Sequence, residues 1–111
     1  MSRNQFLGEF EQLILLAVVR CDGDSYGMAI RKEMEARAGE SVSIGSVYAA
    51  LDRMERKGYV SSDIGDPSPT RGGRAKRYYH LEAPAIDALE RARVRLDRFW
   101  DGVDLPSSTG R

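Results

Sequence analysis

The sequence has 111 residues, which allows one domain with a single hydrophobic core and leaves no room for a second. Hydrophobic residues make up 41% of the chain and charged residues 31%, as in soluble globular proteins, and no apolar run approaches the roughly 18 residues of a membrane span. Positive and negative side chains balance at 17 each, which argues against nonspecific attraction of the whole molecule to nucleic acid. Acidic residues interrupt the N-terminal stretch that a secretory signal would need, so we expect a cytoplasmic protein.

One cysteine, Cys21, and one histidine, His80, limit the chemistry that the chain can support. A single cysteine cannot form an internal disulfide, and the usual zinc-site spacings are absent. The sequence contains no nucleophile paired with a base and no phosphate-binding loop, so we predict neither an enzyme nor a bound metal or cofactor. We expect Cys21 to be a half-buried thiol at a helix end and His80 to lie on the surface of a strand.

Apolar residues at helical spacing predict a first helix over about residues 8 to 20. The opposite side of this helix is also apolar, because it carries Leu15, Leu16 and Val19. A helix that is apolar on both sides must be covered on both. We therefore expect Leu15 and Leu16 to contact a second subunit.

Two further helices are predicted before Gly58. The first spans about residues 26 to 38, with Ser25 as its expected N-cap, and the second starts from a cap at Ser41 or Ser43. One face of this third helix is apolar and turns to the core. On its opposite face we expect mainly small residues with two cations at the margin: Ser46, Ala49, Ala50, Arg53 and Lys57.

A β-hairpin is predicted after the third helix. Strand-forming residues at 59–64 and 75–81 flank a loop rich in glycine and proline. Residues 41–81 carry seven Lys and Arg against four Asp and Glu, so the middle third of this neutral chain is basic. Four of these cations lie in the loop and the returning strand: Arg71, Arg74, Lys76 and Arg77.

The last predicted helix begins near Pro84 and ends near residue 101 or 103. Its apolar residues are separated alternately by four and three residues, which is typical of a helix that packs on another helix. We therefore expect this helix to form a dimer interface, with Trp100 beside the seam, and residues 104–111 to be a disordered tail. The seam contains Ala85, Leu89, Ala92, Leu96, Phe99 and Val103.

Three helices, a hairpin and a fourth helix make a mainly α fold with a small β-hairpin, in the order of a winged helix-turn-helix. We expect residues 1–81 to form a DNA-binding domain and residues 82–103 a dimerisation helix. The small side chains of the third helix permit close approach to the major groove, and Arg53 lies where it can reach phosphate. In the hairpin tip, Gly72 and Gly73 let the backbone approach DNA while the neighbouring cations meet phosphates.

The sequence resembles the PadR-like transcriptional regulators, a family of winged-helix repressors, over about residues 7 to 101. Four segments in combination carry the resemblance: LGEFEQLILLAV at 7–18, SYGMAIRKEME at 25–35, VSIGSVYAALDRMERKGYV at 42–60 and RGGRAKRYYHL at 71–81. The resemblance implies that the start of the recognition helix faces DNA through Ser43, Gly45, Ser46 and Tyr48. It likewise implies that Arg71, Arg74, Lys76 and Tyr78 belong to the DNA-binding wing.

The chain resembles the short members of this family, in which one C-terminal helix forms the dimer. Where the last strand enters that helix, the family commonly has L-T-x-x-G, whereas this chain has LEAP at 81–84 and lacks the hydroxyl cap. Short members can hold flat aromatic ligands between their C-terminal helices. Phe99 and Trp100 are therefore either plain dimer core or the stacking surface for a small planar aromatic effector.

Two hypotheses about function follow. The first is a homodimeric DNA-binding repressor that reads a pseudo-palindromic operator, with half-sites about one helical turn apart. The second is a winged helix that binds another protein and no DNA, for which a neutral net charge is natural. Tyr48 either contacts phosphate or packs in the core. Tyr79 is a better core candidate than Tyr78, because side chains alternate along a strand.

Overall fold

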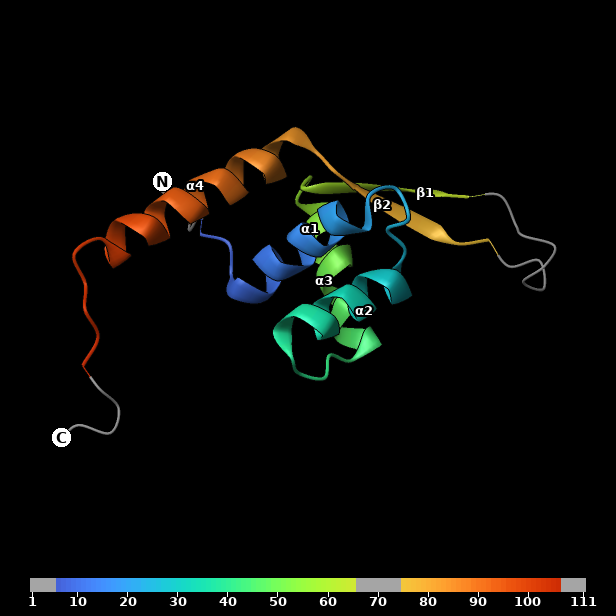
Figure 1. Cartoon of the computed structure of the whole chain (residues 1–111). Coiled ribbons are helices and arrows are strands. Elements are labelled where there is room, and N and C mark those ends of the chain that lie inside the picture. The colour runs from blue at the N-terminus through green and yellow to red at the C-terminus, as the bar shows by residue number, and fades with distance from the viewer. Residues whose placement is uncertain (1–5, 66–74, 107–111) are drawn as a thin grey trace.

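The computed structural model describes residues 6–65 and 75–106. Over these residues it contains four helices and a two-stranded antiparallel sheet, which confirms the predicted mainly α class and winged helix-turn-helix order (Figure 1). The hairpin and the last helix leave the body of the first three helices on opposite sides (Figure 1). The elements are α1 (Glu9–Cys21), α2 (Gly27–Ala38), α3 (Ile44–Arg56), β1 (Val60–Ile64), β2 (Arg77–Leu81) and α4 (Ala83–Trp100).

The core lies where α1 packs against α2, α3 and β2. Ile14 and Leu15 are both fully buried although they are neighbours in sequence, because parts of the same chain cover α1 on more than one side. The prediction that Leu15 meets a second subunit is therefore wrong, whereas Leu16 remains 46% exposed. Other large apolar side chains that are fully buried are Ile30, Val47, Leu51 and Met54.

Ser25 ties the turn between α1 and α2 to the hairpin. Its hydroxyl donates a hydrogen bond of 2.5 Å to the carbonyl oxygen of Tyr79, and its own carbonyl oxygen accepts one of 3.0 Å from the Tyr79 N–H. The next residue, Tyr26, forms an antiparallel bridge with Tyr78, so this turn runs alongside β2. The prediction that Ser25 caps α2 is wrong, because its hydroxyl is taken by Tyr79 and Tyr26 is the N-cap residue.

Ser25→Ala is expected to lower the free energy of unfolding by about 1–3 kcal/mol, because it removes the hydroxyl partner of a buried carbonyl group. Urea unfolding followed by circular dichroism measures this loss. Ser41→Ala is the control, since Ser41 is exposed, and it should change stability by less than about 0.5 kcal/mol. Equal losses in the two variants would mean that the buried bond has no special weight.

The two strands of the hairpin are paired from Val60 opposite Leu81 to Ile64 opposite Arg77. Tyr79 is buried in the core and its neighbour Tyr78 is half-buried, as the alternation of the strand predicts. Burial is the main cause that raises the pKa of the Tyr79 phenol, so this hydroxyl is protonated at neutral pH. Tyr79 therefore serves as a neutral core residue, as predicted.

Helix α4 packs against the rest of the chain along one face, most closely near its start. Glu82 is its N-cap residue without a side-chain hydrogen bond, and Pro84 lies in its first turn. Ala85, Ala88 and Ala92 are buried, so small side chains let the first half lie close to the body. The second half continues away from the body (Figure 1). None of the helices within residues 6–65 and 75–106 is both long and apolar enough to cross a membrane.

Candidate nucleic-acid interface

Helix α3 begins with a capped turn at the protein surface. Ser43 is the N-cap residue, and its Oγ accepts a 3.0 Å hydrogen bond from the N–H of Ser46. The Ser43 hydroxyl also donates to Oγ of Ser46 at 2.8 Å. Of the two caps that the sequence allows, Ser43 is therefore the one used, and both hydroxyls lie at the exposed start of the helix.

The outward face of α3 is lined by small side chains. Gly45, Ser46 and Ala49 are exposed, and a Cβ added to Gly45 would meet no atom within 4 Å. The fold itself thus has room for a side chain at Gly45, and the open space is available to a partner. Ala50 was predicted on this face as well, but it is fully buried because it lies on the side of α3 that packs into the core.

The charged residues of α3 lie toward its C-terminal half. Arg53 is exposed at the end of the small-residue face, as expected for a residue that reaches phosphate. Asp52 forms an ion pair with Arg56 one turn further along, so its carboxylate is balanced within the helix. Lys57 pairs with Glu11 of α1 at 3.3 Å and is therefore occupied within the chain.

Tyr48 lies across the start of α2. Its ring is 45% exposed, so it is not a core aromatic. A Cβ added to Gly27, the first residue of α2, would lie 2.3 Å from the Tyr48 Oη atom. The absence of a side chain at Gly27 is thus what lets the Tyr48 hydroxyl lie against the backbone at the N-terminus of α2.

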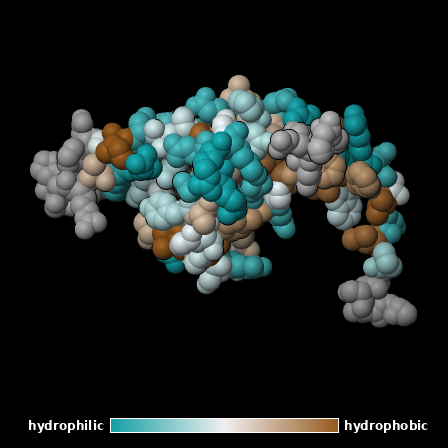
Figure 2. Space-filling view, turned by 180° about the vertical axis from the view of Figure 1, so that it is seen from behind, coloured by the Kyte–Doolittle hydropathy of each residue, from teal (hydrophilic) through white to brown (hydrophobic). Residues whose placement is uncertain are grey.

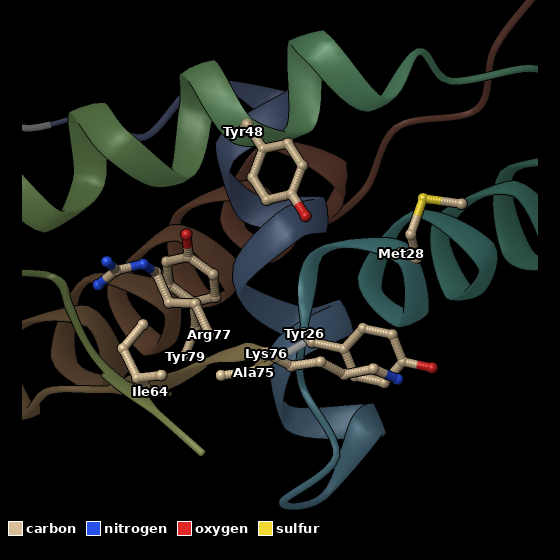
Figure 3. A pocket seen from close by; sticks show the side chains of 8 residues that line it. All are labelled: Tyr26, Met28, Tyr48, Ile64, Ala75, Lys76, Arg77 and Tyr79. Atoms are coloured by element: carbon tan, nitrogen blue, oxygen red, sulfur yellow. The ribbon is translucent and has the colours of Figure 1, made fainter. Parts of the chain in front are cut away.

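A groove of about 710 Å³ separates α3 from the base of the hairpin (Figure 3). In Figure 3 the Tyr48 hydroxyl points from α3 toward Tyr26 and Lys76 across this space. The start of α2, where the backbone N–H groups have no side-chain cap, borders the same groove through Tyr26 and Met28. The remaining lining residues are Ile64, Ala75, Arg77 and Tyr79.

Lys76 lies at the base of the hairpin with its ammonium group on an aromatic ring. Its Nζ is 3.6 Å from the centroid of the Tyr26 ring, and the Tyr26 ring meets Tyr78 edge to face, with 6.0 Å between centroids. Neither pairing was expected from the sequence. Whether Lys76 and Tyr78 contact DNA, as the resemblance implies, stays a prediction.

Arg77 is connected to α3 through a serine of the neighbouring strand. Its Nη1 donates to Oγ of Ser62 on β1 at 2.9 Å, and that hydroxyl donates to Oε2 of Glu55 on α3 at 2.8 Å. On the opposite face of the hairpin, His80 lies exposed within 3.2 Å of the Asp63 carboxylate, which confirms its surface position. The other predicted wing residues, Arg71, Gly72, Gly73 and Arg74, lie outside the described residues.

A second exposed surface is apolar and lies at the far end of α4. Figure 2 shows apolar side chains gathered on the arm formed by the end of this helix and the residues after it. Phe99 is 74% exposed and Leu96 is 59% exposed, and Trp100 and Val103 are about half exposed. Leu16 on α1 adds a further exposed apolar side chain. We call the exposed residues near the end of α4 the terminal apolar surface: Leu96, Phe99, Trp100 and Val103.

The first residues of the predicted dimer seam pack against other parts of the same chain. Ala92 is buried and Leu89 is partly buried against the core cluster. The expectation that Ala92 contacts a second subunit is therefore wrong, because this residue is already covered within the chain. A smaller groove of about 220 Å³ separates Phe6 and Leu7 from α4, and there the Arg95 guanidinium lies 4.2 Å from the centroid of the Phe6 ring.

Other candidate chemical groups have simple environments. Cys21 is a half-buried thiol at the end of α1, as predicted, and its pKa is raised by burial and then by the nearby carboxylates of Glu33 and Asp24. A raised pKa keeps this sulfur in its less reactive thiol form at neutral pH. Among residues 6–65 and 75–106, no group of three or more His, Cys, Asp or Glu side chains could hold a metal ion.

Comparison with known families gives a match over most of the folded region. Residues 15–90 match the family described as Transcriptional regulator PadR-like family. A search of the curated proteins found no match.

Solved structures with the same fold are numerous. The hsRosR chain in the complex structure of hsRosR-SG is 30% identical over 84% of this chain and 76% of that one, with a TM-score of 0.66. A PadR-like transcriptional regulator from Bacillus cereus is 22% identical over 83% of this chain and 84% of its own, with a TM-score of 0.68. A PadR family transcriptional regulator from Eggerthella lenta is 20% identical over 85% of this chain and 81% of its own, with a TM-score of 0.65.

Proposed function

Because the chain belongs to the PadR-like family of transcriptional regulators, we propose that it binds a pseudo-palindromic operator as a homodimer and represses transcription there. The observation that carries this proposal is the outward face of α3. Its exposed start carries Gly45, Ser46 and Ala49, with free space at Gly45, beside a groove bordered by Tyr48 and Lys76. A surface of small residues flanked by polar groups suits a helix that enters the major groove while its neighbours hold the backbone.

The phosphate backbone is proposed to pass along the groove between α3 and the hairpin. The Tyr48 hydroxyl and the uncapped backbone N–H groups of α2 lie on one side of it, and both can donate to phosphate oxygens. Arg53 lies at the other end of the α3 face, exposed. The sequence adds Arg71 and Arg74 in the hairpin loop, where each phosphate contact would release a counterion and strengthen binding at low salt.

Dimer formation is proposed to use the terminal apolar surface. Leu96 and Phe99 continue the seam of α4, Val103 follows shortly after the helix ends, and all three remain about half or more exposed in the described chain. A contiguous apolar surface of this kind on a helix is typical of an interface. Two copies joined there would present two copies of α3 to one duplex, with half-sites about 34–36 Å apart.

An effector site is proposed at the same place. Phe99 and Trp100 are exposed aromatic side chains near the end of α4, and a flat aromatic molecule held between two such helices could stack on them. Such a ligand would change DNA binding by favouring one separation of the two α3 helices over another.

Selection of duplexes from a random pool, followed by affinity measurements over about 50 to 200 mM salt, tests the proposal. The selected duplex should be palindromic and bind at least about a thousandfold more tightly than random duplex. The logarithm of the affinity should fall linearly with the logarithm of the salt concentration. If no duplex is enriched and a protein partner survives nuclease and high salt instead, the winged helix is an interaction module and the proposal is wrong.

A further inference from the structure

The base of the hairpin is bonded to the helix-turn-helix on both of its faces. On one face, the Lys76 ammonium lies 3.6 Å above the Tyr26 ring at the start of α2. On the other, the neighbouring Arg77 bonds Ser62, which in turn bonds Glu55 on α3. Successive residues along an extended chain point to opposite faces, so Lys76 contacts the N-cap residue of α2 on one face, while on the other Arg77 reaches α3 only through Ser62.

Tyr78 also contacts Tyr26, the N-cap residue of α2. Its ring meets Tyr26 edge to face at 82°, and the two residues also form a backbone bridge. A Cβ added to Gly65, the residue just after β1, would lie 2.6 Å from the Tyr78 ring, so this ring lies directly against the Gly65 backbone. The N–H of Gly65 donates to the carbonyl oxygen of Lys76 at 2.8 Å.

Gly65 and Lys76 stand at the two ends of the hairpin loop that carries Arg71 and Arg74. The two described residues that flank this loop are therefore held against aromatic rings, Gly65 against Tyr78 and Lys76 against Tyr26. An ammonium group held over an aromatic ring also gives up part of its hydration, which opposes its use as an independent phosphate ligand.

We propose that Tyr26 is a positioning residue for the DNA-binding wing, and that Lys76 acts through its contact with Tyr26 and not as a phosphate ligand. This inference rests on the proposed function, because it concerns how the wing is presented to DNA. It also changes the expectation for Lys76 that the family resemblance implies, since a basic wing residue is assigned to the protein's own aromatic ring.

The test compares four variants on the duplex selected for the wild-type protein. Tyr26→Leu and Lys76→Met should each weaken binding about tenfold, the size expected for loss of one cation-to-ring contact, without changing the salt slope. The double variant should be no weaker than either single variant, because both remove the same contact. Tyr26→Phe keeps the ring and should bind like the wild type.

Arg74→Met is the matched control for a cation that does contact phosphate. It should flatten the salt slope by about one unit, which Lys76→Met should not do. In NMR spectra, the ε-methylene protons of Lys76 should be shifted upfield by the Tyr26 ring in the wild type and in Tyr26→Phe, and not in Tyr26→Leu. Urea unfolding of each variant separates loss of binding from loss of the fold.

The outcomes distinguish a failure of this inference from a failure of the proposed function. If Lys76→Met flattens the salt slope as Arg74→Met does while Tyr26→Leu binds normally, Lys76 is a phosphate ligand and the inference is wrong. If the losses of the single variants add in the double variant, the two residues act independently and the inference is also wrong. If the wild-type protein enriches no duplex at all, it is the proposed function that fails, and the positioning role falls with it.

Discussion

Ala49→Glu is expected to reduce binding of the selected operator to the nonspecific level, a loss of about a thousandfold or more. Ala49 is exposed on the outward face of α3, between the capped first turn and Arg53. A glutamate there adds bulk where close approach is needed and places a carboxylate against the acceptor-rich edges and phosphates of DNA. The measurement is the affinity for the labelled duplex at moderate salt.

Ala36→Glu is the matched control for this substitution. Ala36 is also an exposed alanine inside a helix, but it lies in the third turn of α2, far along from the Tyr26 end that borders the groove. Both variants change the charge equally and cost the helix about 0.5 kcal/mol or less. Ala36→Glu should therefore keep operator binding within a few fold. Equal losses in the two variants would show that net charge, and not the α3 face, controls binding.

Phe99→Asp is expected to convert the proposed dimer into a monomer and to weaken operator binding about a hundredfold or more. With 74% of its surface exposed, Phe99 contributes little to the core of its own protomer, so the fold should survive the change. A buried interface could not accommodate the new carboxylate without a partner. Each monomer would then hold one half-site without the second attachment. Sedimentation and the affinity for the full operator are the two measurements.

Ile86→Asp on the same helix controls for the added charge. Ile86 is half exposed near the start of α4, outside the seam and before the helix leaves the body. It should remain dimeric and bind the operator like the wild type. A dimer that persists in Phe99→Asp would remove the terminal apolar surface from the proposed interface and point to the exposed side of α1 around Leu16 instead.

Elements with strong periodicity could be predicted from the sequence, because their signals are local. The four helices and both strands start and end within a few residues of the predicted positions. Two of the failures have a distant cause. Ser25 precedes a helix and looks like a cap, but its hydroxyl is taken by Tyr79, 54 positions away. Leu15 looks like an exposed apolar residue only while α1 is considered without the elements that cover it.

Predictions for the candidate site likewise succeed where the sequence signal is local and fail where the contact is between distant segments. The small, exposed residues of α3 could be predicted from helical periodicity, apart from Ala50, which lies one step further around the helix and is buried. The contact between Tyr26 and Lys76 could not, because nothing in either segment reveals that the turn before α2 runs beside β2. Contacts between the hairpin and the turn before α2 become visible only once the hairpin is placed against the helices.

The bonds between Ser25 and Tyr79 have a consequence for synthesis of the protein. A chain emerging from the ribosome exposes its first three helices well before the strand that closes their core, because Tyr79 fills a core position late in the sequence. Nascent chains halted before that point would keep apolar residues of α1 open to chaperones and proteases. The domain should therefore acquire protease resistance in one late step, as the returning strand leaves the exit tunnel.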